Sequence, residues 1–144
     1  MIRIIVVGKI KEKYLSEAVE DYSKRINKYH KLEIIEIPDD NTESEGKKIL
    51  PKIIKNGYNI ALDINGVKTN SKDFSSLIDK TLMHHANINF IIGGSDGLSK
   101  EVIEAADLKI SFSDLTFPHG LFRLILLEQI YRSFKIINNE SYHK

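Results

Sequence analysis

At Ile91-Ile92-Gly93-Gly94-Ser95-Asp96-Gly97 the sequence passes from an apolar run directly into three closely spaced glycines. Glycine has no Cβ, so a loop of this composition lets backbone amides approach a ligand closely. The apolar run predicts a strand at residues 88–92, and a short helical pattern follows at residues 100–105. A strand that opens into such a loop is typical of the sheet edge where α/β proteins bind ligands, although a plain tight turn explains this stretch about as well.

The same alternation extends over the rest of the chain. Apolar runs rich in β-branched residues predict further strands at residues 2–7, 32–37, 58–64 and 108–112. Helical patterns between them predict helices at residues 12–29, 44–55 and 72–84. Strands that alternate with helices predict an α/β fold, with a mostly parallel sheet and helices on both faces.

Length and composition limit the classes of protein to consider. We expect residues 1–144 to form a single domain, because 144 residues is the size of one ordinary domain. No apolar run approaches the roughly 20 residues of a membrane span, so we expect a cytoplasmic protein without membrane contact. The absence of cysteine excludes disulfides and thiolate catalysis, and His84-His85 lacks the spacing of metal ligands, so no metal is expected.

The last predicted helix contains a segment, residues 121–137, that is apolar on nearly every side. Thr116 is its predicted N-cap, and Pro118 suits the first turn. A helix of this kind is not stable on the solvated surface of a small monomer, so it must be buried on more than one side. A dimer interface is the simplest interpretation, and a central position in a monomeric core is the alternative.

Two loops allow competing functional interpretations. Residues 93–97 match the G-x-S-x-G nucleophile elbow of α/β hydrolases, although that fold needs a larger sheet than this chain supplies. Residues 111–120 combine hydroxyl side chains with two phenylalanines, which suits an adenine and its ribose, but a capped helix start is the simpler explanation. A hydrolase and a nucleotide-binding module without catalysis therefore stay open as alternatives.

Six blocks, taken together and in this order, resemble the RlmH family of SPOUT methyltransferases from one end of the chain to the other. They are Val7-Gly8-Lys9, Leu62-Asp63-Ile64-Asn65-Gly66, residues 93–97, residues 112–119, Glu128-Gln129-Ile130-Tyr131-Arg132 and Tyr142-His143-Lys144. The resemblance implies an S-adenosylmethionine-dependent enzyme that methylates N3 of a pseudouridine in large-subunit (23S) ribosomal RNA. A different RNA target is the nearest alternative within the same fold.

The resemblance also implies an architecture and a set of site residues. It implies a SPOUT-type C-terminal trefoil knot and a homodimer built on the C-terminal helix. Tyr142 and His143 match the family's catalytic pair, which is implied to reach the cofactor of the partner subunit; Lys144 stands where some members have arginine. The implied cofactor-binding residues are Leu62, Gly93, Phe112, Ser113, Asp114, Leu115, Thr116 and Phe117.

The reaction places few chemical demands on the protein. A sulfonium methyl is already a strong electrophile, so the protein has chiefly to align it with the base and exclude water. N3 of pseudouridine carries an imide proton that must leave as the methyl arrives. We expect His143 to manage this proton, because histidine titrates near neutral pH, and Tyr142 to stack on or orient the base.

RNA contacts must come from local patches, because the net charge is only +1. Basic side chains contact phosphates and position RNA without reading its sequence. A weakly charged enzyme also suits a large, pre-shaped substrate such as an assembled ribosome, which the resemblance implies as well. The candidate RNA-binding residues are Arg3, Lys9, Lys11, Arg123, Arg132 and Lys144.

Overall fold

The computed structural model describes residues 1–143. Within these residues, five strands form one sheet in the order β2-β1-β4-β3-β5, and every neighbouring pair is parallel. Each strand begins at the residue that the sequence pattern predicts, which confirms the parallel α/β sheet. The strands are β1 (Ile2–Val7), β2 (Leu32–Ile37), β3 (Tyr58–Lys68), β4 (Ile88–Ile92) and β5 (Leu108–Ser111).

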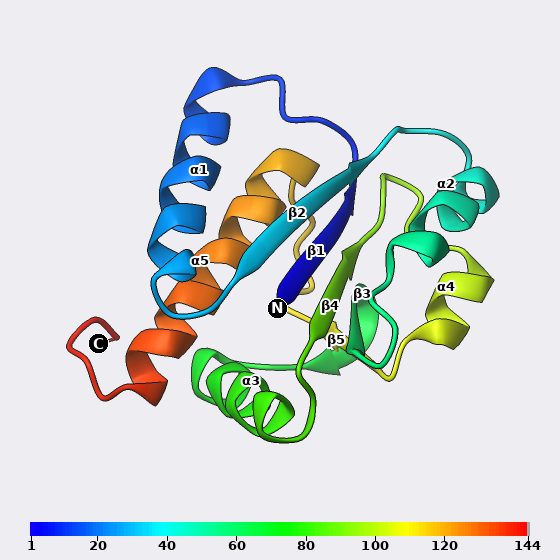
Figure 1. The fold of residues 1–144 in the computed structure, drawn as a ribbon. Coiled ribbons are helices and arrows are strands. Elements are labelled where there is room, and N and C mark those ends of the chain that lie inside the picture. The colour runs from blue at the N-terminus through cyan, green and yellow to red at the C-terminus, as the bar shows by residue number, and fades with distance from the viewer. Residues whose placement is uncertain (144) are drawn as a thin grey trace.

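Helices cover both faces of this sheet, as predicted. In Figure 1, α1, α3 and α5 lie on one side of the strands, and α2 and α4 lie on the other. None of the helices in residues 1–143 has both the length and the apolar composition needed to cross a membrane. The helices are α1 (Lys13–Asn27), α2 (Thr42–Ile49), the 3-10 helix η1 (Leu50–Lys52), α3 (Ser71–His84), α4 (Lys100–Ala105) and α5 (His119–Ile137).

Side chains of alternate strand residues pack into two separate apolar cores, one on each face of the sheet. Ile4 of β1 packs on one face with Phe90 and Leu127, whereas Ile5 packs on the other face with Val102. This follows from the period of two along a strand, which sends successive side chains to opposite faces. Every residue of β4 is buried, as expected for a central strand of a parallel sheet covered on both sides.

Strand β3 contains a bulge that the sequence pattern does not reveal. Its register with β5 is interrupted after Leu62 and resumes at Val67, which lies opposite Ile110. Gly66 lies directly against β5, because a Cβ at this position would be 2.7 Å from backbone atoms of Ile110. The predicted strand ended at residue 64, four residues too early, because a bulge depends on the neighbouring strand as well as on local sequence.

Helix α5 begins later than its predicted cap. Its N-cap is Pro118, which makes no side-chain capping hydrogen bond, and the first helical residue is His119. The prediction of Thr116 as N-cap is therefore wrong. Phe117 precedes a proline, which disfavours the helical conformation at that residue and keeps the chain extended up to the start of α5.

Packing within one chain accounts for much of the apolar character of α5. The helix lies between α1 and α3 on the sheet, and it buries Leu126, Leu127 and Ile130 completely. Leu121 is 37% exposed and Ile125 is half-buried, so apolar surface is left on the opposite side of the helix. The dimer and the knot stay predictions at this point.

Candidate active site

A cavity of about 800 Å³ opens beside the bulge of β3 and beyond the ends of β4 and β5. This volume lies within the range of about 300–1,000 Å³ that is typical of small-molecule sites. Its walls come from the bulge of β3 after Leu62 and from the loops that follow Ile92 and Ser111. The cavity therefore lies at the carboxyl edge of the sheet, where the sequence analysis places the ligand.

The loop after β4 forms a tight turn that contributes backbone to the cavity wall. The Gly97 amide donates to the Gly94 carbonyl oxygen at 3.0 Å, and Gly97 has a φ of +80°. A Cβ at Gly93 would be 2.6 Å from the Gly97 carbonyl oxygen, so no larger residue fits there without moving the turn. Close packing of the chain on itself thus explains Gly93, and the left-handed backbone conformation explains Gly97.

The loop after β5 contributes apolar rings and hydroxyl groups. Phe117 stacks on Phe122 with ring centroids 6.2 Å apart, and Phe112 lies 5.6 Å from the same ring. The Ser113 hydroxyl accepts a hydrogen bond from the Leu115 amide at 2.9 Å, which fixes the turn between the two phenylalanines. This wall therefore offers an aromatic surface with a polar edge.

Most residues of the predicted cofactor set line this one cavity. Asp114 does not; its carboxylate forms an ion pair with Lys68 of β3 on the exposed surface. The cavity also contains residues that the sequence analysis missed, among them Asp63 and Asn65 from the bulge of β3 and His119 from α5. The predicted residues that line it are Leu62, Gly93, Phe112, Ser113, Leu115, Thr116 and Phe117.

The nucleophile-elbow alternative receives no support from the arrangement of side chains. Ser95 is exposed at the tip of the turn. Among residues 1–143, no histidine or carboxylate is hydrogen-bonded to its hydroxyl, whereas a catalytic serine needs an adjacent base.

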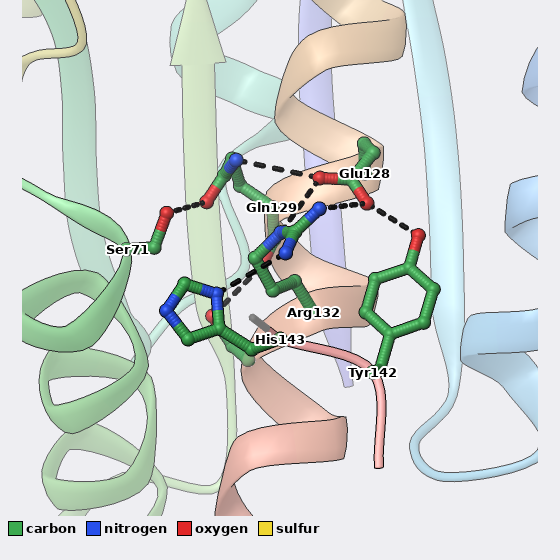
Figure 2. A network of polar contacts seen from close by, with 7 residues as sticks. Ser71, Glu128, Gln129, Arg132, Tyr142 and His143 are labelled. Carbon is green, nitrogen blue, oxygen red and sulfur yellow. Dashed lines mark hydrogen bonds and ion pairs between the residues drawn. The ribbon is translucent and has the colours of Figure 1, made fainter.

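Tyr142 and His143 join a polar network on α5 (Figure 2). The Tyr142 hydroxyl donates to Oε2 of Glu128 at 2.6 Å, and Arg132 donates to both oxygens of the same carboxylate, at 3.0 and 3.2 Å. Arg132 also lies 4.9 Å from the centre of the Tyr142 ring, and its Nη1 lies 3.1 Å from Nδ1 of His143. Burial, followed by the bond to Glu128, raises the pKa of Tyr142, so this phenol stays protonated.

The structure does not bring this pair to the cavity of the same chain. Neither Tyr142 nor His143 lines it, and Figure 1 shows the C-terminal segment at the opposite end of α5 from the loops at the carboxyl edge of the sheet. A smaller cavity of about 170 Å³ lies between the two regions. Phe112 lines both this smaller cavity and the large one. Ser71 and Gln129 line the smaller cavity too, and the hydrogen bond of 2.8 Å between them links it to the network.

The candidate RNA-binding residues are scattered. Lys9 and Lys11 are exposed just after the carboxyl end of β1. Arg3 lies near the amino end of that strand, where it binds Glu33 at 2.9 Å. Arg132 is held in the network, and Lys144 lies outside the described residues.

Arg123 is a correction to the predicted RNA-binding set. Its side chain is only 3% exposed, because α5 packs over the sheet at this point. The guanidinium binds Glu36 of β2 at 2.6 Å and the Gly8 carbonyl oxygen at 2.9 Å. It therefore ties the end of β1 to α5, and it presents no surface to a phosphate.

A family model described as "Predicted SPOUT methyltransferase" matches residues 1–143. The chain belongs to the SPOUT methyltransferases. This confirms the resemblance on which the sequence analysis rests. Among curated SPOUT relatives, proteins called ribosomal RNA large subunit methyltransferase H from Clostridium perfringens, Clostridium kluyveri and Carboxydothermus hydrogenoformans are 52%, 49% and 48% identical. In each case the match covers 99% of both chains.

Solved structures of other methyltransferases share the SPOUT fold. A probable methylase family protein from Haemophilus influenzae superposes with a TM-score of 0.57 at 10% identity, covering 99% of this chain and 70% of the other. The SpoU methyltransferase AviRb from Streptomyces viridochromogenes, solved in complex with AdoMet, gives a TM-score of 0.52 at 12% identity, with 92% and 57% covered. At such low identity these likenesses show the fold alone.

Proposed function

We propose that this SPOUT methyltransferase transfers a methyl group from S-adenosylmethionine to N3 of a pseudouridine in large-subunit (23S) ribosomal RNA. The observation that carries the proposal is the cavity at the carboxyl edge, which gathers seven of the eight predicted cofactor residues. The names of the relatives that match over the whole chain point to ribosomal RNA as the substrate.

The residues of the cavity fit this cofactor chemically. Leu62 and Phe117 supply apolar surface suited to an adenine, and Ser113 and Thr116 supply hydroxyl groups suited to a ribose. Asp63 adds a carboxylate on the same wall, suited to the ribose hydroxyls or to the amino group of the methionine part. The bound cofactor supplies an electrophilic methyl group, and the protein aligns it with the base.

The proposal includes a homodimer through α5. Tyr142 and His143 do not line the cavity of their own chain, so a second copy is the simplest way to bring them to a bound cofactor. The network that holds them lies on the same helix as Leu121, whose side chain is partly exposed. The site would then be complete only when two chains meet.

Mixing two inactive variants tests this arrangement. Gly93→Val should abolish cofactor binding, and His143→Ala removes the imidazole of the C-terminal segment (the tail, residues 138–144) while leaving cofactor affinity nearly intact. A heterodimer of the two keeps one intact cavity facing one intact tail, so we expect about a quarter of wild-type activity after the subunits are exchanged. Activity of the His143→Ala protein alone at the wild-type level would remove His143 from the mechanism, and no recovery on mixing would contradict the shared site.

The substrate is tested by mass spectrometry of ribosomal RNA nucleosides from cells with and without the gene. We expect a methylated pseudouridine to disappear and to return on complementation. Loss of a different methylated nucleotide would keep the enzyme class and change the target. An unchanged set of nucleosides, together with no calorimetric binding of S-adenosylmethionine, would overturn the proposal.

The RNA contacts follow from the same placement. Lys9 and Lys11 are the basic residues of the predicted set that lie exposed after β1, at the carboxyl edge of the sheet. We expect them to bind phosphates of an RNA presented by the assembled ribosome, in the cytoplasm. Charge reversal at both positions should weaken RNA binding and leave cofactor binding unchanged.

A further inference from the structure

The contact between Arg132 and His143 determines which ring nitrogen of the histidine carries a proton. A guanidinium group has only hydrogen-bond donors and stays charged at all ordinary pH values. Its Nη1 lies 3.1 Å from Nδ1 of His143, so Nδ1 has to be the acceptor. In this arrangement the imidazole is neutral and carries its proton on Nε2.

Glu128 holds Arg132 in the orientation that this contact needs. Its two carboxylate oxygens accept from Nε and Nη2 of Arg132 at 3.0 and 3.2 Å, which leaves Nη1 directed toward His143 (Figure 2). Such a two-point ion pair fixes the plane of the guanidinium group as well as its position. The ring of Tyr142, 4.9 Å from the guanidinium carbon, packs on the same group.

We infer that Glu128 and Arg132 are positioning residues that hold His143 as the neutral Nε2–H tautomer, so that His143 meets the target base as a hydrogen-bond donor and not as a proton acceptor. The inference rests on the proposed function and deepens it. Both ring nitrogens are already engaged, because the Nδ1 lone pair faces Arg132 and Nε2 carries the proton. His143 therefore cannot take the imide proton without leaving Arg132.

A donor at this position matches the charge that develops on the base. The N3–H bond breaks first, and its proton passes to bulk water before the base is aligned with the methyl group; the N3–methyl bond then forms while the methyl–sulfur bond of the donor breaks and leaves its electron pair on sulfur. The negative charge of the deprotonated imide is shared between N3 and the two flanking carbonyl oxygens. An Nε2–H group directed at one of these oxygens stabilises that anion, as donors in oxyanion holes do.

Substitution of His143 distinguishes a donor from a base. Glutamine places an amide N–H near the position of Nε2 but cannot accept a proton at neutral pH. We expect His143→Gln to keep kcat within about tenfold of the wild type, and His143→Ala to lose about a hundredfold, a typical cost of removing one oxyanion donor. Equal losses in the two variants would overturn the inference.

The tautomer is measured directly by long-range ¹H–¹⁵N NMR on the full-length protein labelled at its five histidines. The His143 signals are assigned by their absence from the His143→Gln spectrum. We expect the Nε2–H pattern in the wild type and a shift toward the mixed tautomers of free histidine in Arg132→Met. An Nδ1–H or doubly protonated ring in the wild-type protein would contradict the inference, whatever the enzyme's substrate proves to be.

A matched pair of carboxylate variants separates positioning of His143 from general anchoring of the tail. Glu128→Gln should lower kcat by about tenfold, with unchanged KM for RNA and unchanged affinity for S-adenosylmethionine. Glu140 is the control, because it binds Tyr29 at 2.8 Å and Lys135 at 3.0 Å but does not contact Arg132. Glu140→Gln should change kcat by less than about twofold. Equal losses in the two variants would show that Glu128 merely anchors the tail.

If wild-type protein shows the Nε2–H tautomer but leaves pseudouridine unmethylated, the proposed function fails and the role of Arg132 in holding the tautomer stands. If methylation is observed but the tautomer is Nδ1–H, only the inference fails. The two conclusions are therefore tested separately.

Discussion

The cavity wall and the C-terminal network belong to the same proposed site but are built from different parts of the chain. The turn at residues 93–97 is closed by a backbone hydrogen bond, and it is so tight that a Cβ at Gly93 would not fit. The network at Glu128, Arg132 and Tyr142 is held entirely by side-chain hydrogen bonds and an ion pair. Substitutions that add side-chain volume should therefore disrupt the cavity wall. Substitutions that remove a charge or a single polar atom should disrupt the network.

The strongest test of this difference is volume added to the wall. In Gly93→Val, the new Cβ meets a carbonyl oxygen at 2.6 Å, so the turn must open. We expect the affinity for S-adenosylmethionine, measured by calorimetry, to fall by at least about a hundredfold, which corresponds to about 2.7 kcal/mol. Lys100→Ala, at an exposed position of α4 that does not line the cavity, is the control and should bind normally. If valine is tolerated, the wall is not held by close packing.

A second volume test lies in β3, next to the cavity. In Gly66→Ala the added methyl group would approach backbone atoms of Ile110 to 2.7 Å, and the two strands must separate. We expect the free energy of unfolding in urea to fall by about 2–3 kcal/mol, the upper part of the usual range for point mutants. Val67→Ala, at a neighbouring residue that is 67% exposed, should cost less than about 0.5 kcal/mol.

In the network, loss of one oxygen atom should affect the reaction without affecting the fold. Tyr142→Phe removes the hydrogen bond of 2.6 Å to Glu128 and keeps the aromatic ring. We expect kcat for RNA methylation to fall by about tenfold, equivalent to about 1.4 kcal/mol of transition-state stabilisation. The cofactor affinity and the melting temperature should change little. A fall in cofactor affinity with unchanged kcat would mean that the network and the wall are not separate.

His30 offers a smaller, pH-dependent test at the end of α5 away from the wall. It stacks on Phe134 at 6.0 Å, and its Nε2 is buried without a hydrogen-bond partner. Burial, and then the positive N-terminus, lower its pKa below the ordinary value of 6.5. The unfolded chain therefore binds more protons, and stability should decrease as the pH falls below about 6.5. His30→Phe should remove this part of the pH dependence in urea titrations, whereas His84→Asn, at an exposed position, should leave it in place.

The smallest effect is expected at Asp114, where the sequence analysis and the structure differ. Its side chain is 71% exposed and is paired with Lys68, and it does not line the cavity. Exposed ion pairs contribute about 0.2–1 kcal/mol, so Asp114→Asn should change cofactor affinity by less than about threefold. A loss of cofactor affinity as large as that of Gly93→Val would show that Asp114 does belong to the cofactor site.

Much of the fold was predictable from the sequence because strands and helices impose local periods. The apolar runs located the first residue of every strand, and the glycines after Ile92 located the loop that lines the cavity. The resemblance then identified the family and seven of the residues that line the cavity. By contrast, no local pattern separated Arg123, which is buried beside Glu36, from an exposed lysine such as Lys9.

The sequence by itself determined the order and type of the elements and the family, because these follow from side-chain periodicity and from short blocks of neighbouring residues. Only the tertiary structure decided that β3 bulges around Gly66, that α5 starts after Pro118, and that Tyr142 lies on Glu128 and not at the cavity. Each of these features depends on contacts between residues that are far apart in the sequence. The spacing of residues along the chain carries no information about such contacts.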